Sequence, residues 1–319
     1  MGQLVEGRWQ TGPIAGGGNG RFDRPESRFR NWVTPDGPHR PAPGRYHLYV
    51  SLACPWAHRT LIFRRLKGIE EIIGLSVTHW LMGEEGWTFE PGDGMIPDPG
   101  GARFLHEIYT RADPRCTGKV TVPVLWDKEA STIVSNESAD IIRMFNSAFN
   151  ALGAAPDDYY PEALRPEIDA LNARIYDTVN NGVYKAGFAT TQAAYEAAVI
   201  PLFETLEWLE EHLSRRRYLC GDAITEADWR LFTTLLRFDA VYIGHFKCNL
   251  RRLVDYPNLW GYARDLYSQP GVSSTCEFSH IKRHYYMSHP DVNPTGIVPA
   301  GPLVDWDTPT MRERGRRYA

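Results

Sequence analysis

Residues 46–57, which read YHLYVSLACPWA, decide the fold class of the N-terminal half of this chain. Residues 46–50 are rich in strand formers, and this composition predicts a buried β-strand. Cys54 and Pro55 follow directly, and apolar residues then recur at mixed helical spacing until Gly68, which suits a helix C-terminus. The stretch therefore predicts a strand that passes into a helix at a Cys-Pro pair.

The elements that follow extend this beginning into a thioredoxin-like order. A second apolar strand at 72–77 completes a strand–helix–strand unit, whose strands pair in parallel. Strands at 120–126 and 131–134 make a hairpin, and Ser135 can cap the helix that follows. The intervening segment, 81–118, is dense in Gly and Pro, and we interpret it as a long insertion.

The second half is purely helical in pattern. Apolar residues recur every three or four positions, which predicts helices at 164–179, 199–213, 227–242 and 259–267. The third of these is apolar on several faces, which indicates a central buried helix, and Thr225 to Asp228 at its start is typical of an N-terminal cap. We therefore expect an N-terminal arm at 1–44, a thioredoxin-like α/β domain at 45–150 with the insertion at 81–118, an all-α domain at 157–287 and a C-terminal arm at 288–319.

The composition argues against several other classes of protein. Of the 319 residues, 43% are apolar and 12% are aromatic, enough for a sizeable core, and the formal net charge of -4 does not favour nucleic acid. Five cysteines without paired spacing indicate neither a disulfide framework nor a zinc site. No apolar stretch has the length of a signal peptide or a membrane span. We expect a cytoplasmic protein with no metal and with no membrane or nucleic-acid partner.

Cys54 is the first candidate for chemistry. At a helix N-terminus, backbone N–H groups and the helix dipole favour negative charge, and this can leave a cysteine ionised at neutral pH. A dithiol redox enzyme would carry a second cysteine three residues on, where this chain has Ala57. The site is therefore monothiol and needs an external thiol to complete a cycle. The alternative is an inert, buried cysteine at a strand–helix junction.

Two further features suit the recognition of a peptide. Pro123 follows Val122 inside a predicted strand, where a cis proline in a bend would turn the backbone groups of Val122 outward. An ordinary trans proline on an edge strand is the alternative. Glu137 and Ser138 open a helix whose N–H groups suit a carboxylate, while Glu137 could take an ammonium group. Plain helix capping would also explain this pair.

These three features in this order, together with the helical second half, resemble the glutathione transferase superfamily. The resemblance covers nearly the whole chain and implies the glutathione transferase architecture, which usually forms a homodimer. More narrowly, CPWAHR at 54–59, GWTF at 86–89 and HIKRHYY at 280–286 are similar to the glutathionyl-hydroquinone reductases, the Xi class. Both arms and the insertion fit that class as well.

The resemblance also implies a set of site residues. Cys54 would be the catalytic cysteine, and Tyr184 and Tyr285 would act in catalysis and in substrate binding, with Tyr286 and His284 as adjacent substrate-site candidates. Glutathione would be held by Trp87, Arg103, Val122, Pro123, Glu137 and Ser138. Read from the residues alone, Trp87 could be a packing aromatic, Arg103 a surface charge, and the tyrosines amphipathic packing residues.

The activity implied is the glutathione-dependent reduction of glutathionyl-hydroquinones to hydroquinones. It would proceed through a mixed disulfide of Cys54 with glutathione and release oxidised glutathione, with glutathione as co-substrate. Two alternatives stay open. An omega-like thioltransferase or dehydroascorbate reductase would use the same cysteine, and a protein of this architecture could also only bind partners, although the motif around Cys54 argues against that.

Overall fold

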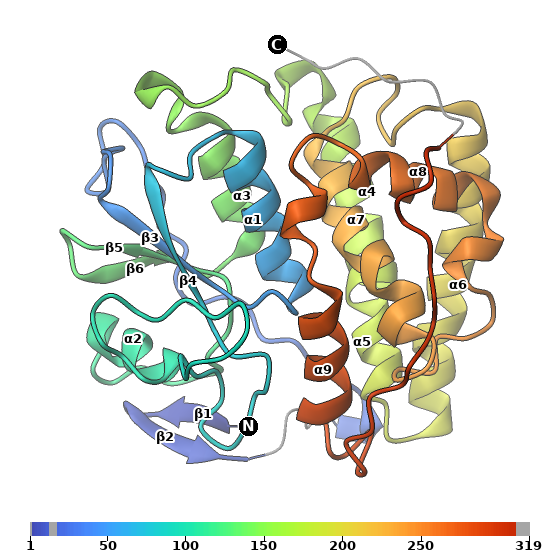
Figure 1. Ribbon diagram of the computed structural model, residues 1–319, viewed down its shortest axis with the longest axis horizontal. Coiled ribbons are helices and arrows are strands. Elements are labelled where there is room, and N and C mark those ends of the chain that lie inside the picture. The colour runs from blue at the N-terminus through green and yellow to red at the C-terminus, as the bar shows by residue number, and fades with distance from the viewer. Residues whose placement is uncertain (1, 13–17, 311–319) are drawn as a thin grey trace. The chain divides into compact units, whose positions relative to one another are not determined.

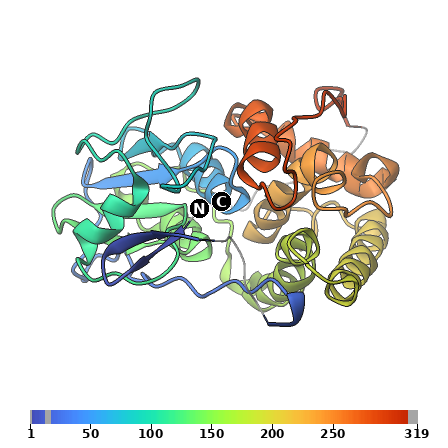
Figure 2. The same cartoon turned by 90° about the horizontal axis from the view of Figure 1, so that it is seen from below.

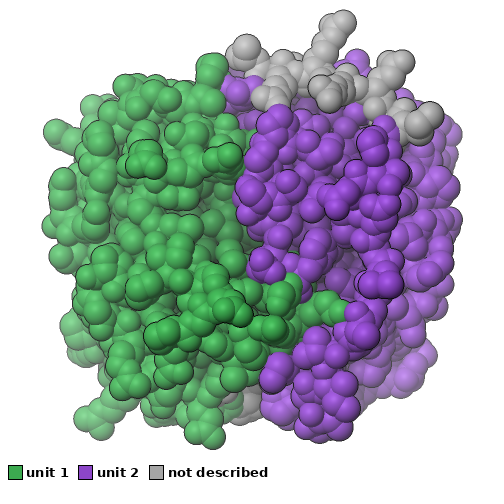
Figure 3. All heavy atoms as spheres, viewed as in Figure 1, with its two compact units in different colours: residues 1–14, 24–156, 279–284 green, residues 15–23, 157–278, 285–319 purple. Residues whose placement is uncertain are grey.

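The computed structural model describes residues 2–12 and 18–310, and its chain forms two compact units, coloured separately in Figure 3. Unit 1 comprises residues 1–14, 24–156 and 279–284, and unit 2 comprises residues 15–23, 157–278 and 285–319. The division after Pro156 coincides with the predicted start of the helical domain. Residues 279–284, however, group with unit 1, whereas the prediction placed them in the helical domain.

The four-stranded sheet of unit 1 has the order β4-β3-β5-β6 (Figure 1). Its strands are β3 (Tyr46–Val50), β4 (Ile73–Val77), β5 (Val124–Asp127) and β6 (Thr132–Ser135). β4 runs parallel to β3, whereas β5 is antiparallel to both β3 and β6. Every residue of β3 is buried, as its apolar run predicts for a strand covered on both faces. The predicted thioredoxin-like order is confirmed.

The helices of this unit begin and end where backbone chemistry allows. They include α1 (Pro55–Leu66), α2 (Leu105–Ala112) and α3 (Ser138–Ser147), and α1 and α3 pack side by side (Figures 1 and 2). Pro55 occupies the first helical position, where its missing N–H breaks no hydrogen bond, and Gly68 follows the end of α1 with φ of 61°.

The predicted cap of α3 was wrong by two residues. The N-cap is Glu137, whose side chain accepts a hydrogen bond from the backbone N–H of Ala139. Ser135 instead ends β6, and its hydroxyl accepts from the backbone N–H of Glu137 at 3.1 Å. β6 ends one residue later than predicted, so Ser135 belongs to the strand and lies two residues before the N-cap of α3.

The segment 81–118 is more regular than its composition suggests, because it contains α2. Leu105, Ile108 and Tyr109 are the buried residues of this helix, and α2 contacts β6. Eight residues give little more than two turns of apolar spacing, and the surrounding glycines and prolines hide that short period. The predicted insertion therefore contributes a helix that covers the sheet.

The N-terminal arm starts as a hairpin. β1 (Gly2–Val5) and β2 (Arg8–Thr11) are antiparallel, and Glu6 and Gly7 in the turn have positive φ. Leu4 exchanges two backbone hydrogen bonds of 2.9 Å with Gly118. The arm thus packs on the body of unit 1.

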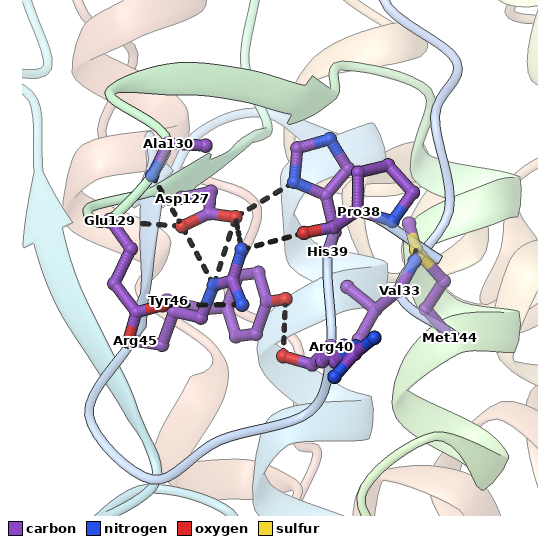
Figure 4. A network of polar contacts seen from close by, with 10 residues as sticks. All are labelled: Val33, Pro38, His39, Arg40, Arg45, Tyr46, Asp127, Glu129, Ala130 and Met144. Atoms are coloured by element: carbon purple, nitrogen blue, oxygen red, sulfur yellow. Dashed lines mark hydrogen bonds and ion pairs between the residues drawn. The ribbon is translucent and has the colours of Figure 1, made fainter. Parts of the chain in front are cut away.

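A buried carboxylate joins the next part of the arm to β5 (Figure 4). Asp127, fully buried, accepts from Arg45 and contacts His39 at 2.7 Å, and it also accepts from the backbone N–H groups of Glu129 and Ala130. Burial by itself would raise the pKa of Asp127, but the hydrogen bonds from Arg45, His39 and Ala130 lower it to about 2. The carboxylate is therefore ionised at neutral pH and holds arm, strand and turn together.

Unit 2 is built from helices in the described part of the chain (Figure 1). They include α4 (Arg165–Ile175), α5 (Gly182–Gly187), α6 (Gln192–Arg215), α7 (Glu226–Arg237) and α8 (Pro257–Tyr267), and α9 (Phe278–Ser288) lends its last residues to this unit. Every residue of α7 is buried, which confirms the predicted central helix. Thr225 and Asp228 form the expected capping box.

Two of the predicted long helices end in π-helical turns. The turn Tyr176–Asn180 separates α4 from α5, and the turn Phe238–Tyr242 ends α7. A π turn inserts one extra residue per turn, so it rotates the side chains that follow without ending the helical run. The apolar spacing that predicted continuous helices does not reveal these turns.

The described part of the C-terminal arm is tied to α8 by an aromatic contact. The ring of Trp306 lies 4.8 Å from that of Trp260 and 5.4 Å from that of Tyr267, and Arg264 donates to the backbone carbonyl of Thr308.

Within residues 2–12 and 18–310, no helix is both long enough and apolar enough to cross a lipid bilayer.

Candidate active site

Cys54 occupies the N-cap of α1, directly before Pro55. Its side chain is partly exposed, and its Sγ lies 3.6 Å from the carbonyl oxygen of Val122, a position from which a thiol can donate. The first N–H groups of a helix point toward its N-cap and carry the positive end of the dipole. The structure therefore places this sulfur at the N-terminus of α1, the position that the sequence predicted.

The other four cysteines are in surroundings of the opposite kind. Burial raises the pKa of the Cys220, Cys248 and Cys276 thiols to about 12, and burial also raises the pKa of the Cys116 thiol. All five cysteines lie within the described residues, and none is in a disulfide. At neutral pH these four are protonated and unreactive, because only the thiolate is a good nucleophile.

The peptide bond between Val122 and Pro123 is cis, so of the two geometries that the sequence left open the trans one is excluded. β5 begins only at Val124, so Val122 lies outside the regular ladder of the sheet. Together with the contact between Val122 and the Cys54 sulfur, this places the bend directly beside the N-terminus of α1.

The start of α3 carries the predicted acidic and hydroxyl pair. Glu137 accepts from the N–H of Ala139 through Oε1 at 3.1 Å, and Ser138, nearly buried, is the first residue of the helix. The buried guanidinium of Arg59, on α1, donates to the Ser138 hydroxyl at 3.3 Å. The two helix N-termini that the sequence singled out are thus joined through a side chain of the CPWAHR motif.

Two guanidinium groups flank the ring of Trp56, the second residue of α1. The carbon of the Arg59 guanidinium lies 4.5 Å from the ring centroid, and that of Arg24, from the N-terminal arm, lies 4.8 Å away. Cation–π contacts of this kind hold the ring and bring positive charge to the first turns of the helix. Sequence reasoning missed both arginines, although Arg59 lies within the motif.

Two of the candidate residues, Trp87 and His284, are in direct contact. Their rings stack at 4.8 Å, and His284 Nδ1 lies 2.9 Å from the backbone oxygen of Trp80. His280, one helical turn earlier on α9, places its Nε2 2.7 Å from the backbone oxygen of Asp93. The two histidines of the HIKRHYY motif therefore hold the segment 80–93 at both ends, which fixes the loop that carries Trp87.

The glycine of the GWTF motif also has a physical reason. Gly86 has φ of 71°, and a Cβ added to it would lie 3.0 Å from the ring of Trp9. Trp9, in the N-terminal hairpin, donates from Nε1 to the backbone oxygen of Glu84. A side chain at position 86 would be strained and crowded, so this position favours glycine.

Arg103 lies at the surface of unit 1. Its guanidinium is 3.9 Å from the Glu90 carboxylate and its carbon is 5.2 Å from the ring centroid of Phe104. With about three quarters of the side chain exposed (73%), it has room to turn toward a ligand, and it is equally well explained as a surface charge.

Unit 2 contains a chain of tyrosine hydroxyl groups. The oxygens of Tyr184, on α5, and Tyr285, on α9, are 2.5 Å apart, and the oxygen of Tyr242, in the π turn, lies 3.0 Å from that of Tyr285. Tyr242 and Tyr285 are fully buried, and Tyr184 is half-buried. These tyrosines are therefore hydrogen-bonded to one another rather than being only packing residues.

Burial keeps the inner members of this chain neutral. It raises the pKa of Tyr242 and Tyr285 well above 10, an effect that the neighbouring Tyr184 strengthens and the buried Arg237 opposes. At neutral pH each of these hydroxyls can donate a hydrogen bond. Sequence reasoning missed Tyr242, which was visible only as an apolar position of the predicted helix 227–242.

The adjacent candidate Tyr286 does not belong to this chain of hydroxyl groups. Its ring meets that of His245 at 4.9 Å, and burial raises the pKa of its hydroxyl. Because successive residues of a helix point about 100° apart, Tyr285 and Tyr286 face different neighbours. Of the adjacent candidates, Tyr285 is in the hydroxyl chain, His284 stacks on Trp87, and Tyr286 packs on His245.

Comparison with known proteins supports the same family from both halves. Family models for the glutathione S-transferase N-terminal domain and C-terminal domain match residues 53–148 and 192–265. Glutathionyl-hydroquinone reductase PcpF of Sphingobium chlorophenolicum is 58% identical over 304 residues, which cover 95% of this chain and 96% of that protein. Glutathione S-transferase omega-like 2 of Schizosaccharomyces pombe is 49% identical over 295 residues, 89% of this chain and 94% of that protein.

Solved structures give a similar result. The glutathione-bound structure of YqjG, a glutathione transferase homologue from Escherichia coli K-12, has a TM-score of 0.90 and 53% identity, covering 98% of this chain and 99% of that one. A Xi-class glutathione transferase from Natrialba magadii has a TM-score of 0.93 and 48% identity, covering 98% and 97%. The chain therefore belongs to the glutathione transferase superfamily and, within it, to the Xi class of glutathionyl-hydroquinone reductases.

Proposed function

We propose that this chain reduces glutathionyl-hydroquinones to hydroquinones, with Cys54 as the nucleophile and glutathione as the second thiol. The observation that carries the proposal is the position of Cys54, the partly exposed cysteine at the tip of α1, beside the bend at Val122 and Pro123. The 58% identical relative named as a glutathionyl-hydroquinone reductase supports the choice of substrate class.

The first step transfers glutathione from carbon to Cys54. The thiolate attacks the sulfur that joins glutathione to the aromatic ring, so an S–S bond forms and the C–S bond breaks. The electron pair of that bond stays on the ring carbon, which takes a proton, and the hydroquinone leaves. Cys54 is then linked to glutathione in a mixed disulfide.

The second step restores the enzyme. The thiolate of another glutathione attacks the glutathione sulfur of the mixed disulfide, and oxidised glutathione leaves. The electron pair of the S–S bond returns to Cys54, whose thiolate is again stabilised by the N-terminus of α1. The net reaction converts one glutathionyl-hydroquinone and one glutathione into a hydroquinone and oxidised glutathione.

Unit 1 would hold glutathione along the backbone features described above. Val122, held outside the ladder by cis-Pro123, would pair with the extended peptide, and Trp87 and Arg103 would bind its other groups. The N–H groups and hydroxyl at Ser138 suit the carboxylate of the γ-glutamyl end. The carboxylate of Glu137 suits the ammonium group beside it.

The tyrosines of unit 2 would act on the aromatic ring of the substrate. Tyr184 and Tyr285 would donate hydrogen bonds to a phenolic or quinone oxygen, with His284 and Tyr286 as further substrate-binding candidates. A donor to that oxygen stabilises charge that develops on the ring as the C–S bond breaks. Because the inner hydroxyls stay neutral, they can donate at physiological pH.

The main competing activity uses the same cysteine on another substrate. The omega-like relative, 49% identical, favours reduction of glutathione mixed disulfides or of dehydroascorbate as the second candidate. A comparison of kcat/KM for a glutathionyl-hydroquinone, a small mixed disulfide and dehydroascorbate separates the two. A higher value for either of the last two would replace the proposed substrate class.

We also propose a cytoplasmic location and a homodimer. A cytoplasmic protein has glutathione at hand and keeps a reactive thiol reduced. Homodimers are the implied state of this architecture, and light scattering behind gel filtration measures it directly. A mass of one chain at micromolar concentration would contradict the dimer.

The direct test of the proposed function traps the first step. The protein is mixed with a glutathionyl-hydroquinone in the absence of free glutathione and analysed by intact-protein and peptide mass spectrometry. We expect one glutathione adduct on Cys54 together with free hydroquinone. Cys54→Ala should form none, whereas Cys276→Ser, which alters the other partly exposed cysteine, should behave as the wild type. Hydroquinone release by Cys54→Ala would contradict the proposal.

A further inference from the structure

The N-terminal arm runs along the free edge of β6 and reaches the start of α3. Asn31 donates from its backbone N–H to Val134 at 2.9 Å, and Asn136 donates to the backbone oxygen of Phe29 at 3.1 Å. The side chain of Asn136 accepts in turn from the N–H of Phe29. These bonds fix the register of residues 27–31 against the turn that leads into α3.

The acidic side chains at the start of α3 would affect the binding of a ligand that carries both an ammonium group and a carboxylate. It carries the carboxylates of Glu137 at the N-cap and Asp140 one turn later, both within reach of the helix N-terminus. A γ-glutamyl group has an ammonium group, which needs one carboxylate of the protein as its partner. It also has a carboxylate of its own, which a second carboxylate of the protein would repel. Selective binding therefore requires that one acidic side chain be oriented and the other neutralised.

Ser27 of the arm orients the first of these carboxylates. Its hydroxyl donates to Oε2 of Glu137 at 2.9 Å, while Oε1 of Glu137 accepts from the N–H of Ala139 at 3.1 Å. Oε1 also accepts from the Ser138 hydroxyl at 3.5 Å. With donors on both oxygens, the plane of the carboxylate is set, and Oε2 keeps acceptor capacity for an ammonium group. A carboxylate held in this way does not have to lose side-chain entropy when the ligand binds.

Arg30 neutralises the second carboxylate. Its Nε and Nη2 donate to the two oxygens of Asp140 at 2.7 and 2.8 Å, a bidentate pair. Asp140 is nearly buried, whereas the Arg30 side chain is half-exposed. Arg30 thus balances the negative charge of Asp140 beside the helix N-terminus.

We infer that Ser27 and Arg30 of the N-terminal arm are positioning residues for the γ-glutamyl end of glutathione. Ser27 orients Glu137 to accept the ammonium group of glutathione, and Arg30 screens the carboxylate of glutathione from Asp140. This inference rests on the glutathione site proposed above and adds to it a part of the chain that lies outside the thioredoxin-like sheet. Arg28, between the two residues, pairs instead with Asp113 after α2 and provides a matched control from the same segment of the arm.

The test measures glutathione binding by isothermal titration calorimetry with the full chain, without any hydroquinone. Ser27→Ala should raise the Kd for glutathione about tenfold, the effect of a lost hydrogen bond to a charged group. Ser27→Thr, which keeps the hydroxyl, should recover most of the affinity. Arg28→Ala should bind within about twofold of the wild type. Thermal unfolding of each variant checks that the fold is intact.

A ligand that lacks the ammonium group separates positioning from a general structural role. Glutaryl-Cys-Gly is glutathione without its amino group, so Glu137 has nothing to accept from it. Ser27→Ala should therefore weaken this analogue much less than glutathione. Equal losses for both ligands, or an unchanged Kd for glutathione, would overturn the role of Ser27.

The role of Arg30 has its own compensating variant. Arg30→Gln should weaken glutathione binding, and more so at low salt, because Asp140 then repels the ligand carboxylate. Arg30→Gln combined with Asp140→Asn should recover affinity, since the unbalanced charge is gone. Failure to recover would overturn this half of the inference. Absence of glutathione binding by the wild type would overturn the inference and the proposed function together, whereas lack of hydroquinone turnover with normal binding would overturn only the latter.

Discussion

The candidate residues of unit 1 and those of unit 2 are assembled in different ways. In unit 1, Cys54, Val122 and Ser138 each lie at or beside the first residue of an element, so backbone groups do much of the work. In unit 2, hydroxyls from α5, the π turn and α9 meet, and the pairs that bond are 101 and 43 residues apart in the chain. The first kind of site is written in short motifs, whereas the second exists only after helices have packed.

The largest effect on activity should come from a substitution of Cys54, whose sulfur no backbone group of unit 1 can replace. Cys54→Ser should lower kcat/KM for a glutathionyl-hydroquinone by about a thousandfold or more, because the hydroxyl is not ionised at neutral pH. Glutathione should still bind with a Kd close to that of the wild type, since the backbone features remain. Steady-state rates and calorimetry test both parts, and lost binding would mean that the sulfur holds the site together.

The next effect concerns the carboxylate that joins the arm to the sheet of unit 1. Asp127→Asn should lower the free energy of unfolding by about 3 kcal/mol at pH 7, because Arg45 loses its buried partner. Asp36→Asn, an exposed position in the same arm, should change it little. Urea unfolding measures both, and equal stability of Asp127→Asn and the wild type would show that the network of Figure 4 is dispensable.

The same carboxylate predicts how stability depends on pH. The pKa of Asp127 is lowered to about 2 in the folded chain, against about 3.9 for an unfolded aspartate. Its contribution, about 3 kcal/mol, is therefore present above about pH 4 and is lost as the pH falls through 2. The stability difference between the wild type and Asp127→Asn should narrow over that window, and a constant difference would contradict the assigned shift.

The hydroxyl chain of unit 2 should respond to single substitutions less strongly than Cys54. Tyr285→Phe removes its middle member and should lower kcat/KM for a glutathionyl-hydroquinone about thirtyfold. Turnover of a small glutathione mixed disulfide, which has no phenolic oxygen, should change little. Tyr195→Phe, whose hydroxyl donates to the backbone of Lys247, is the matched control in the same unit. Equal losses on both substrates would indicate a structural role for Tyr285.

The smallest effect is expected at the inner end of that chain. Tyr242→Phe leaves the bond between Tyr184 and Tyr285 in place and removes only the partner behind it. One lost neutral hydrogen bond corresponds to about a fivefold fall in kcat/KM. A loss as large as that of Tyr285→Phe would show that the three hydroxyls act as one group.

This contrast also explains what could be predicted from the sequence. The buried strand at 46–50, the junction at Cys54 and Pro55, the cis bond before Pro123 and the capping box at Thr225 are local, and short-range patterns predicted them. The glutathione transferase fold followed from their order.

The features that escaped prediction are short or long-range. α2 is too brief to show its period among glycines and prolines, and the π turns leave the apolar spacing unchanged. The bond from Ser27 to Glu137 joins residues 110 positions apart, and Tyr242 looked like any other apolar position of its helix. Neither contact leaves a local signal, because each depends on how distant segments pack.

The proposed reactivity of Cys54 depends above all on the ionisation of its sulfur by the N-terminus of α1, and the rate of alkylation of this thiol as a function of pH measures that ionisation directly. With iodoacetamide in excess and Cys54→Ser as the background, we expect modification of Cys54 to keep most of its maximal rate at about pH 7. A rate that falls tenfold for each pH unit below about 8.5, as for an ordinary thiol, would contradict the central claim.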